Sequence, residues 1–106
     1  AAVRQALNLM GTWGVSQMPV LDDGQSVGGL IEGTLMARAL AQPALLERPV
    51  SEVMDPPFPE VEAGTAVDRV GAMLTRESPA ALVRREGKLI GIVSRYDVLQ
   101  RLIAAR

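Results

Sequence analysis

The sequence contains no cysteine and no histidine, and each absence removes a class of chemistry. Without cysteine the chain can form neither a disulfide framework nor a thiolate metal site. Without histidine it lacks both the usual general base and the commonest metal ligand. We therefore expect no catalytic residue and no metal site. The formal net charge of -1 creates no field that would attract a polyanion, which argues against a nucleic-acid partner.

Aromatic side chains and long apolar runs are also scarce. Only 3% of the residues are aromatic while 48% are hydrophobic, so the core has to be aliphatic, which is typical of helices layered on sheets. No apolar run approaches the length of a bilayer span, and no signal-peptide pattern opens the chain. These features predict a cytoplasmic protein without a membrane partner. A chain of 106 residues suffices for one domain rather than two large ones.

An internal repeat organises the chain, and each copy opens with a helical pattern. Apolar residues follow the i, i+3, i+4, i+7 spacing of one helix face near the N-terminus and again in the second half. The two sets are Val3, Ala6, Leu7 and Met10, and Val67, Val70, Gly71 and Leu74. Each copy is therefore predicted to begin with an amphipathic helix.

The repeat continues as a hairpin and a second helix, because residues 20–36 align without a gap on residues 83–99. In each copy a first strand ends in charged residues, and the chain then turns at Gly24 or Gly87. A second apolar strand follows, and a helix closes the copy. Several apolar residues of the closing helices are expected to face inward. They are Leu35, Met36, Ala39 and Leu40 in the first copy, and Val98, Leu99, Leu102 and Ile103 in the second.

The second copy is preceded by a short extended segment, Phe58 to Val61, for which the first copy has no counterpart. We therefore expect an α/β (α+β) fold of two pseudosymmetric motifs, each a small mixed sheet with two helices, the first lacking its lead strand. The motifs are predicted to span residues 1–49, including a linker, and residues 50–106, and to form one domain together. Because the first helix begins almost at residue 1, we expect a piece of a longer protein.

The strand-to-helix junction Gly91-Ile-Val-Ser-Arg-Tyr-Asp97 is the most informative local motif. The hydroxyl of Ser94 and the first N–H groups of the helix can bind a phosphate, and the carboxylate of Asp97 can accept hydrogen bonds from two ribose hydroxyls. The same spacing fits a helix cap with Ser94 as the N-cap, and the residues alone leave both interpretations open. Thr65 and Asp68 share the spacing but follow a turn, so we interpret them as a cap only.

These features resemble the tandem CBS pair, also called a Bateman module. The resemblance covers nearly the whole chain and rests on four features: Pro19-Val20, the two turn glycines, Val50-Ser-Glu-Val-Met54, and the junction at residues 91–97. It implies a non-catalytic regulatory module that binds an adenosyl ligand in the cleft between its two halves. By matching position, Ser94 and Asp97 would hold the phosphate side and the ribose of that ligand.

The resemblance also implies contacts around the adenine from the residues before the Pro-Val strand, here Val15, Ser16 and Met18. Val15 and Met18 also fit a plain core role, and Arg95 fits either a phosphate contact or a solvated helix start. In the first copy Ile31 and Thr34 replace the serine and the aspartate, which predicts a weak or vacant second site.

A closer resemblance links residues 14–21, 28–32 and 54–61 to the C-terminal regulatory region of bacterial cystathionine beta-synthase-type enzymes, which are pyridoxal-phosphate proteins. It implies that a catalytic domain lies upstream in the parent protein and that this chain itself holds no cofactor. It also implies that AMP, ADP, ATP or S-adenosylmethionine is the regulator. It further implies a homodimer. The alternative is a constitutive dimerisation or scaffold module that binds no ligand.

Overall fold

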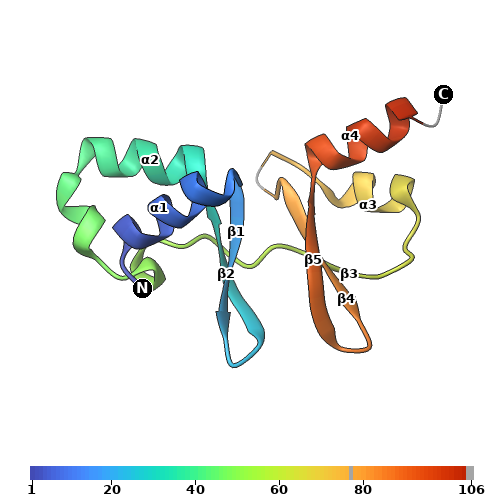
Figure 1. The fold of residues 1–106 in the computed structure, drawn as a ribbon, viewed down its shortest axis with the longest axis horizontal. Coiled ribbons are helices and arrows are strands. Elements are labelled where there is room, and N and C mark those ends of the chain that lie inside the picture. The colour runs from blue at the N-terminus through green and yellow to red at the C-terminus, as the bar shows by residue number, and fades with distance from the viewer. Residues whose placement is uncertain (77, 105–106) are drawn as a thin grey trace. The chain divides into compact units, whose positions relative to one another are not determined.

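Helices and short strands alternate along the chain in a computed structural model that describes residues 1–76 and 78–104 (Figure 1). The elements are α1 (Val3–Trp13), β1 (Gln17–Asp22), β2 (Gln25–Ile31), α2 (Glu32–Ala41), the 3-10 helices η1 (Pro43–Glu47) and η2 (Val50–Glu52), β3 (Glu60–Glu62), α3 (Val67–Met73), β4 (Ala80–Arg85), β5 (Lys88–Ser94) and α4 (Arg95–Ala104). They form two compact units, Ala1–Pro57 (unit 1) and Phe58–Arg106 (unit 2). The predicted mixed α/β class with two repeated motifs is confirmed.

Unit 1 is built on an antiparallel hairpin of β1 and β2. Its turn contains Asp23 and Gly24, both with positive φ (51° and 77°), a combination that matches the right-handed twist of the strands. Pro19 lies in β1, and because proline has no N–H to donate it belongs in an edge strand. Within the described residues this sheet has two strands, so the first motif lacks a lead strand as predicted.

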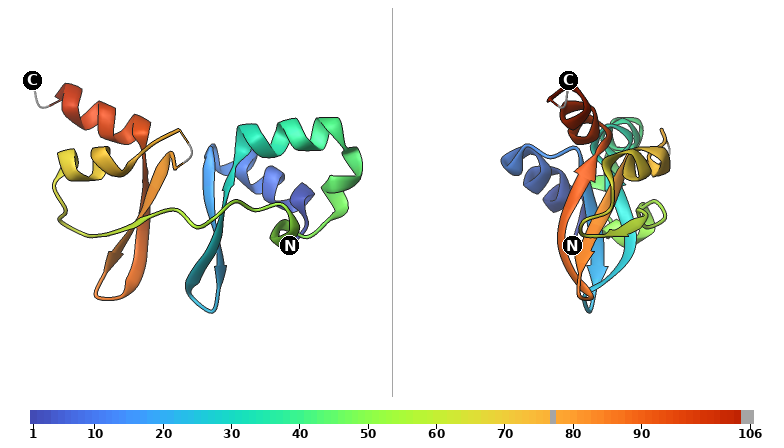
Figure 2. Two further views of the ribbon diagram at one scale, coloured as in Figure 1. Left: turned by 180° about the vertical axis from the view of Figure 1, so that it is seen from behind. Right: turned by 90° about the vertical axis from the view of Figure 1, so that its right-hand side faces the viewer.

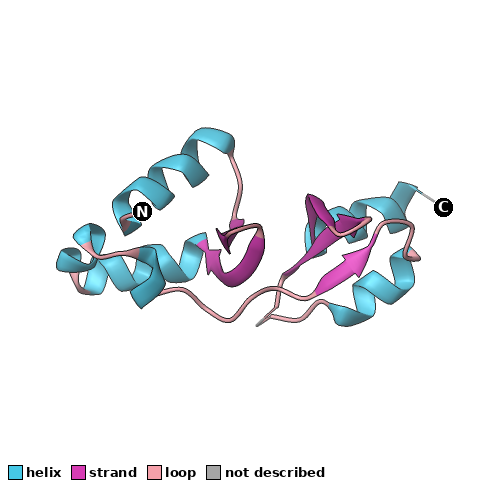
Figure 3. Cartoon of the chain, turned by 90° about the horizontal axis from the view of Figure 1, so that it is seen from below, coloured by secondary structure: helices cyan, strands magenta, loops and turns pink. Residues whose placement is uncertain are grey.

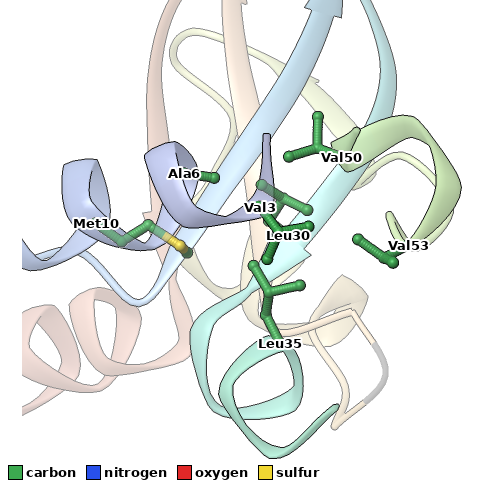
Figure 4. Close-up of a cluster of buried hydrophobic side chains, with 7 residues drawn as sticks. All are labelled: Val3, Ala6, Met10, Leu30, Leu35, Val50 and Val53. Atoms are coloured by element: carbon green, nitrogen blue, oxygen red, sulfur yellow. The ribbon is translucent and has the colours of Figure 1, made fainter. Parts of the chain in front are cut away.

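The core of unit 1 joins residues from α1, β2, α2 and η2. Figure 4 shows their side chains converging between these elements. The buried members are Val3, Ala6, Met10, Leu30, Leu35, Val50 and Val53. The predicted apolar face of the first helix is therefore confirmed, since its remaining member, Leu7, packs against the same cluster.

The segment that follows η2 also packs on unit 1. Asp55 forms an antiparallel bridge with Gly29 in which each N–H donates to the other residue's carbonyl oxygen at 2.9 Å. Nη1 of Arg38 donates to the carbonyl oxygen of Val53 at 3.0 Å. The boundary between the two compact units thus lies after Pro57. The boundary between the two sequence motifs, predicted at residue 50 from the repeat, stays a prediction.

The absence of a side chain at Gly28, in β2, is structurally required. A Cβ built on Gly28 would collide with the thioether of Met54 and would lie 3.0 Å from the carbonyl oxygen of Asp55. We expect Gly28→Ala to lower the free energy of unfolding by about 1–3 kcal/mol, because the bridge at Gly29 prevents the backbone from yielding. The matched control is Gly91→Ala, where nothing lies within 4 Å. Equal urea midpoints for the two variants would contradict this account.

Unit 2 contains a three-stranded sheet in the order β3-β4-β5, with β3 parallel and β5 antiparallel to β4. Figure 2 shows the hairpin of β4 and β5 in orange. The N–H of Leu82 donates to the carbonyl oxygen of Pro59 at 2.8 Å, which extends the β3 pairing. Nε of Arg84 donates to Glu60 across the same strand pair at 2.6 Å, and this hydrogen bond raises the pKa of the Arg84 guanidinium. The core is formed by Phe58, Val70, Ala80, Ala81 and Leu82.

In each unit the helices lie beside the strands (Figure 3). In unit 2, α3 and α4 contact each other where Gly71 lies against Val98, since a Cβ on Gly71 would be 3.3 Å from that side chain. Within the described residues, none of the helices is both long and apolar enough to cross a membrane.

The predicted inward faces of the closing helices are only partly correct. Leu35 and Ala39 are buried and Val98 is half-buried. The other predicted residues are 48–81% exposed, and their inward orientation is wrong; they are Met36, Leu40, Leu99, Leu102 and Ile103. The reason is geometric: a helix contacts one sheet along a single stripe, while these apolar residues cover a wider arc than that stripe.

Candidate functional site

The structure brings Ser94 and Asp97 together at the junction of β5 and α4. The N–H and the hydroxyl of Ser94 both donate to Oδ2 of Asp97, at 2.9 and 3.0 Å, and the N–H of Asp97 donates back to Oγ of Ser94 at 3.2 Å. This reciprocal arrangement is a capping box, which confirms the structural interpretation of the motif. The N–H of the intervening Arg95 donates to the carbonyl oxygen of Pro79 at 3.0 Å and ties the junction to the start of β4.

The cap leaves half of the carboxylate of Asp97 available. Its bonds with Ser94 all involve Oδ2, and no group of the described residues donates to Oδ1. The side chain is exposed and lies in the first turn of α4, where the helix dipole favours negative charge. Asp97 is therefore a preoriented hydrogen-bond acceptor, and its structural role does not compete with a role toward a ligand.

Asp97 lines a cavity of about 220 Å³ within unit 2. The cavity lies between the sheet, α3 and α4, and its wall is mainly valine. The polar members of the lining are Glu62, Thr65, Asp97 and Arg101. Ligand pockets usually measure about 300–1,000 Å³, so this cavity alone would enclose only part of a nucleoside.

Two charged residues of the cavity, Glu62 and Arg101, were not predicted from the sequence. Arg101 lies four residues after Asp97, and this spacing places both on one face of α4, a signal that was present in the sequence. Glu62 lies at the end of β3, and its position depends on the parallel pairing of β3 with β4, for which the local sequence carries no signal.

The interpretation of Thr65 and Asp68 as a cap is wrong. The N-cap of α3 is Ala66, and no side chain caps this helix. The hydroxyl of Thr65 instead donates to the carbonyl oxygen of Glu62 at 2.6 Å. Gly64 adopts a left-handed φ of 91°, and the chain forms a tight turn there. This turn brings the hydroxyl of Thr65 to the carbonyl oxygen of Glu62.

The other predicted site residues are divided between the two units. Val15 and Met18 of unit 1 are half-buried and pack against its core, which gives both a structural role. Ser16 is exposed, and its carbonyl oxygen accepts the N–H of Glu32 at 2.9 Å. Arg95 is also exposed and forms no salt bridge with any described residue. The roles of these four residues toward a ligand remain predictions.

The first copy carries no equivalent of the Ser94–Asp97 pair. Ile31 is the N-cap of α2 and offers no side-chain hydrogen bond, and Thr34 is exposed. No group of three or more acidic side chains that could hold a metal occurs in the part of the chain that the structure describes.

Two repeated units of this architecture define the class as a paired α/β module with a capped strand-to-helix junction. The family model for the CBS domain matches residues 50–104, and the chain belongs to the CBS-domain family. It is a CBS domain pair, and CBS domains are regulatory modules rather than catalytic ones.

Solved structures share the whole architecture. A putative signal-transduction protein with CBS domains from Burkholderia ambifaria is 27% identical, with a TM-score of 0.83, over 100% of this chain and 79% of that one. The CBS-domain protein ATU1752 from Agrobacterium tumefaciens is 23% identical, with a TM-score of 0.83, over 95% and 82%. The CBS domain pair of the protein MJ0100, in complex with 5′-methylthioadenosine and S-adenosylmethionine, is 19% identical, with a TM-score of 0.82, over 100% and 85%.

Proposed function

We propose that this CBS pair binds an adenosyl ligand, AMP, ADP, ATP or S-adenosylmethionine, and thereby regulates an attached or partner domain. The observation that carries the proposal is the carboxylate of Asp97, held by Ser94 at 2.9 and 3.0 Å beside a cavity, with Oδ1 available. A carboxylate of this kind can accept hydrogen bonds from the adjacent hydroxyls of a ribose. The complex of the MJ0100 pair with two adenosyl compounds supports the same ligand class.

The remaining contacts are assigned by chemistry and by family resemblance. Ser94 and Arg95 would face the phosphate side of a nucleotide, and Val15, Ser16 and Met18 would surround the adenine. Regulation follows if the ligand binds one conformation of the pair more tightly, because only this difference in affinity can shift the population that a neighbouring domain senses. For the parent protein we propose a pyridoxal-phosphate-dependent cystathionine beta-synthase-type enzyme.

A second function, constitutive dimerisation without a ligand, is favoured by the apolar surface of α4. Leu99, Leu102 and Ile103 are each about half exposed, and a row of apolar side chains on one helix is suited to pairing with a second copy. A homodimer is compatible with either function. The two therefore differ only in whether the protein binds an adenosyl ligand.

A thermal-shift comparison of the four adenosyl ligands tests the proposal. A ligand that binds only the native state stabilises it by about 2.7 kcal/mol at 100 times its Kd, so at least one ligand should raise the Tm in a concentration-dependent way. Ribose 5-phosphate, which lacks the adenine, serves as the control. If none of the four changes the Tm at millimolar concentration, the ligand function is wrong and the dimerisation module is favoured.

A further inference from the structure

The side chain of Arg84 joins β3 to the hairpin of β4 and β5. Its Nε donates to Oε1 of Glu60 at 2.6 Å, and its Nη2 donates to Oε2 of the same carboxylate at 3.4 Å. Its Nη1 donates to the carbonyl oxygen of Gly87, in the hairpin turn, at 3.1 Å. The side chain of Arg84 is 12% exposed, and a two-pronged pair of this kind is stronger than an ordinary surface salt bridge. The guanidinium therefore fixes Glu60, at the start of β3, to the hairpin.

The main chain of Arg84 holds the other end of β3. Glu62 lies opposite Arg84 in the parallel register, and the N–H of Ala63 donates to the carbonyl oxygen of Arg84 at 2.7 Å. Strand β3 has only three residues, so one arginine contacts it at its start through the side chain and just beyond its end through the main chain. Short edge strands open locally unless they are tied down. The position of Ala63 therefore depends on Arg84.

The turn that follows β3 forms one wall of the cavity that Asp97 lines. The wall is made by Glu62, Ala63, Gly64 and Thr65. Within the turn, the N–H and the hydroxyl of Thr65 both donate to the carbonyl oxygen of Glu62, at 3.1 and 2.6 Å. These bonds close the turn on itself, so a shift of β3 moves the wall as one piece. Because Asp97 lies on α4, its separation from this wall depends on how β3 is attached to β4.

The hairpin itself does not require an arginine at this position. In the repeat, Leu21 of unit 1 corresponds to Arg84. Both hairpins shift register directly before this position, between Val20 and Leu21 and between Val83 and Arg84. Both also turn through two residues of positive φ. Since the hairpin of unit 1 forms with a leucine that is 47% exposed, the arginine serves the attachment of β3 rather than the hairpin.

We propose that Arg84 is a positioning residue of the ligand site, which holds the turn at residues 62–65 where the cavity can receive a ligand bound to Asp97. The proposal rests on the adenosyl function proposed above. Arg84 does not line the cavity, so it acts through β3 and the turn. A wall that is held in place before the ligand arrives costs less free energy to order on binding. Loss of the attachment therefore weakens affinity without removing a ligand contact.

Hydrogen exchange of Arg84→Met, in the full chain labelled with ¹⁵N, tests the positioning role without any ligand. Methionine keeps an unbranched apolar stem and removes the guanidinium. The amides of Ala63 and Thr65 should exchange faster, whereas the amide of Ser94, in the capping box, should be unchanged. Arg85→Met makes the same chemical change at the next, exposed residue of β4 and should leave all three amides as in the wild type. Unchanged exchange at Ala63 in Arg84→Met would overturn the proposal whatever the ligand experiments show.

Affinity for the adenosyl ligand gives the second readout. Arg84→Met should weaken binding about 2- to 30-fold, the range for a residue that acts on a site without contacting the ligand, and Arg85→Met should bind like the wild type. The exchanged pair, Glu60→Arg with Arg84→Glu, restores the ion pair and should recover part of both the affinity and the protection of Ala63, whereas Glu60→Arg alone should not. Faster exchange at Ala63 with wild-type affinity would refute the positioning role. Failure of the wild type to bind any of the four ligands would instead refute the adenosyl function on which the proposal rests.

Discussion

Asp97→Ala is expected to weaken the binding of the adenosyl ligand about 5- to 150-fold. The estimate corresponds to about 1–3 kcal/mol, the usual effect of removing a charged hydrogen-bond partner. Oδ1 would receive the ribose hydroxyls, and the bonds to Ser94 already fix the side chain, so binding requires little further ordering. Isothermal titration calorimetry with the ligand that gives the largest thermal shift measures the change directly.

Three further variants test whether a loss of binding results from loss of the cap. Asp97→Asn keeps an oxygen that can accept the N–H of Ser94 but removes the charge, so it should reduce affinity with little change in stability. Thr34→Ala, at the equivalent position of the first copy, and Asp68→Ala, in the first turn of α3, should leave affinity nearly unchanged. Wild-type affinity in Asp97→Ala would show that the carboxylate is a cap and nothing more.

Leu82→Ala is expected to lower the free energy of unfolding by about 2–5 kcal/mol, the range for buried leucine truncations. Leu82 lies in the central strand of unit 2 with no exposed surface, so truncation removes apolar contacts and leaves a cavity. Strands β3 and β5 flank this position on both sides, which limits how far the surroundings can collapse. Urea denaturation monitored by circular dichroism measures the loss.

The matched control for this prediction is Leu40→Ala on α2. The side chain of Leu40 is 81% exposed, and surface substitutions of this kind usually change stability by less than about 0.5 kcal/mol. The same chemical change is thus compared at a buried and an exposed leucine. If the two variants unfolded at the same urea concentration, the assignment of Leu82 to the core would be wrong.

The features that were predictable from the sequence depend on neighbours along the chain. The turns at Asp23-Gly24 and Glu86-Gly87 both place two successive residues at positive φ, and a turn glycine between two apolar runs signals this geometry. The capping box of Ser94 and Asp97 joins residues three apart, so its spacing was visible as well. The repeat itself then indicated that both halves would share one fold.

Other features depend on contacts between distant segments. Thr65 has the spacing of a cap, yet its hydroxyl donates to Glu62 in the preceding turn, and that turn also pairs with β4, where the N–H of Ala63 donates to the carbonyl oxygen of Arg84. The exposure of Leu99 and Leu102 follows from the single stripe by which α4 contacts its own unit. Neither outcome can be derived from periodicity, which gives the faces of a helix but not what covers them.

The amino-acid sequence by itself determined the order of the elements, the two hairpin turns, the repeated motif and the residues of the strand-to-helix junction, since each arises from side chains within one turn of one another. Only the tertiary structure decided that Met54 and Asp55 cover the edge of β2 and that Asp97 and Arg101 share one cavity. These outcomes depend on which strand edges and helix faces find a partner, and that choice is made by long-range packing.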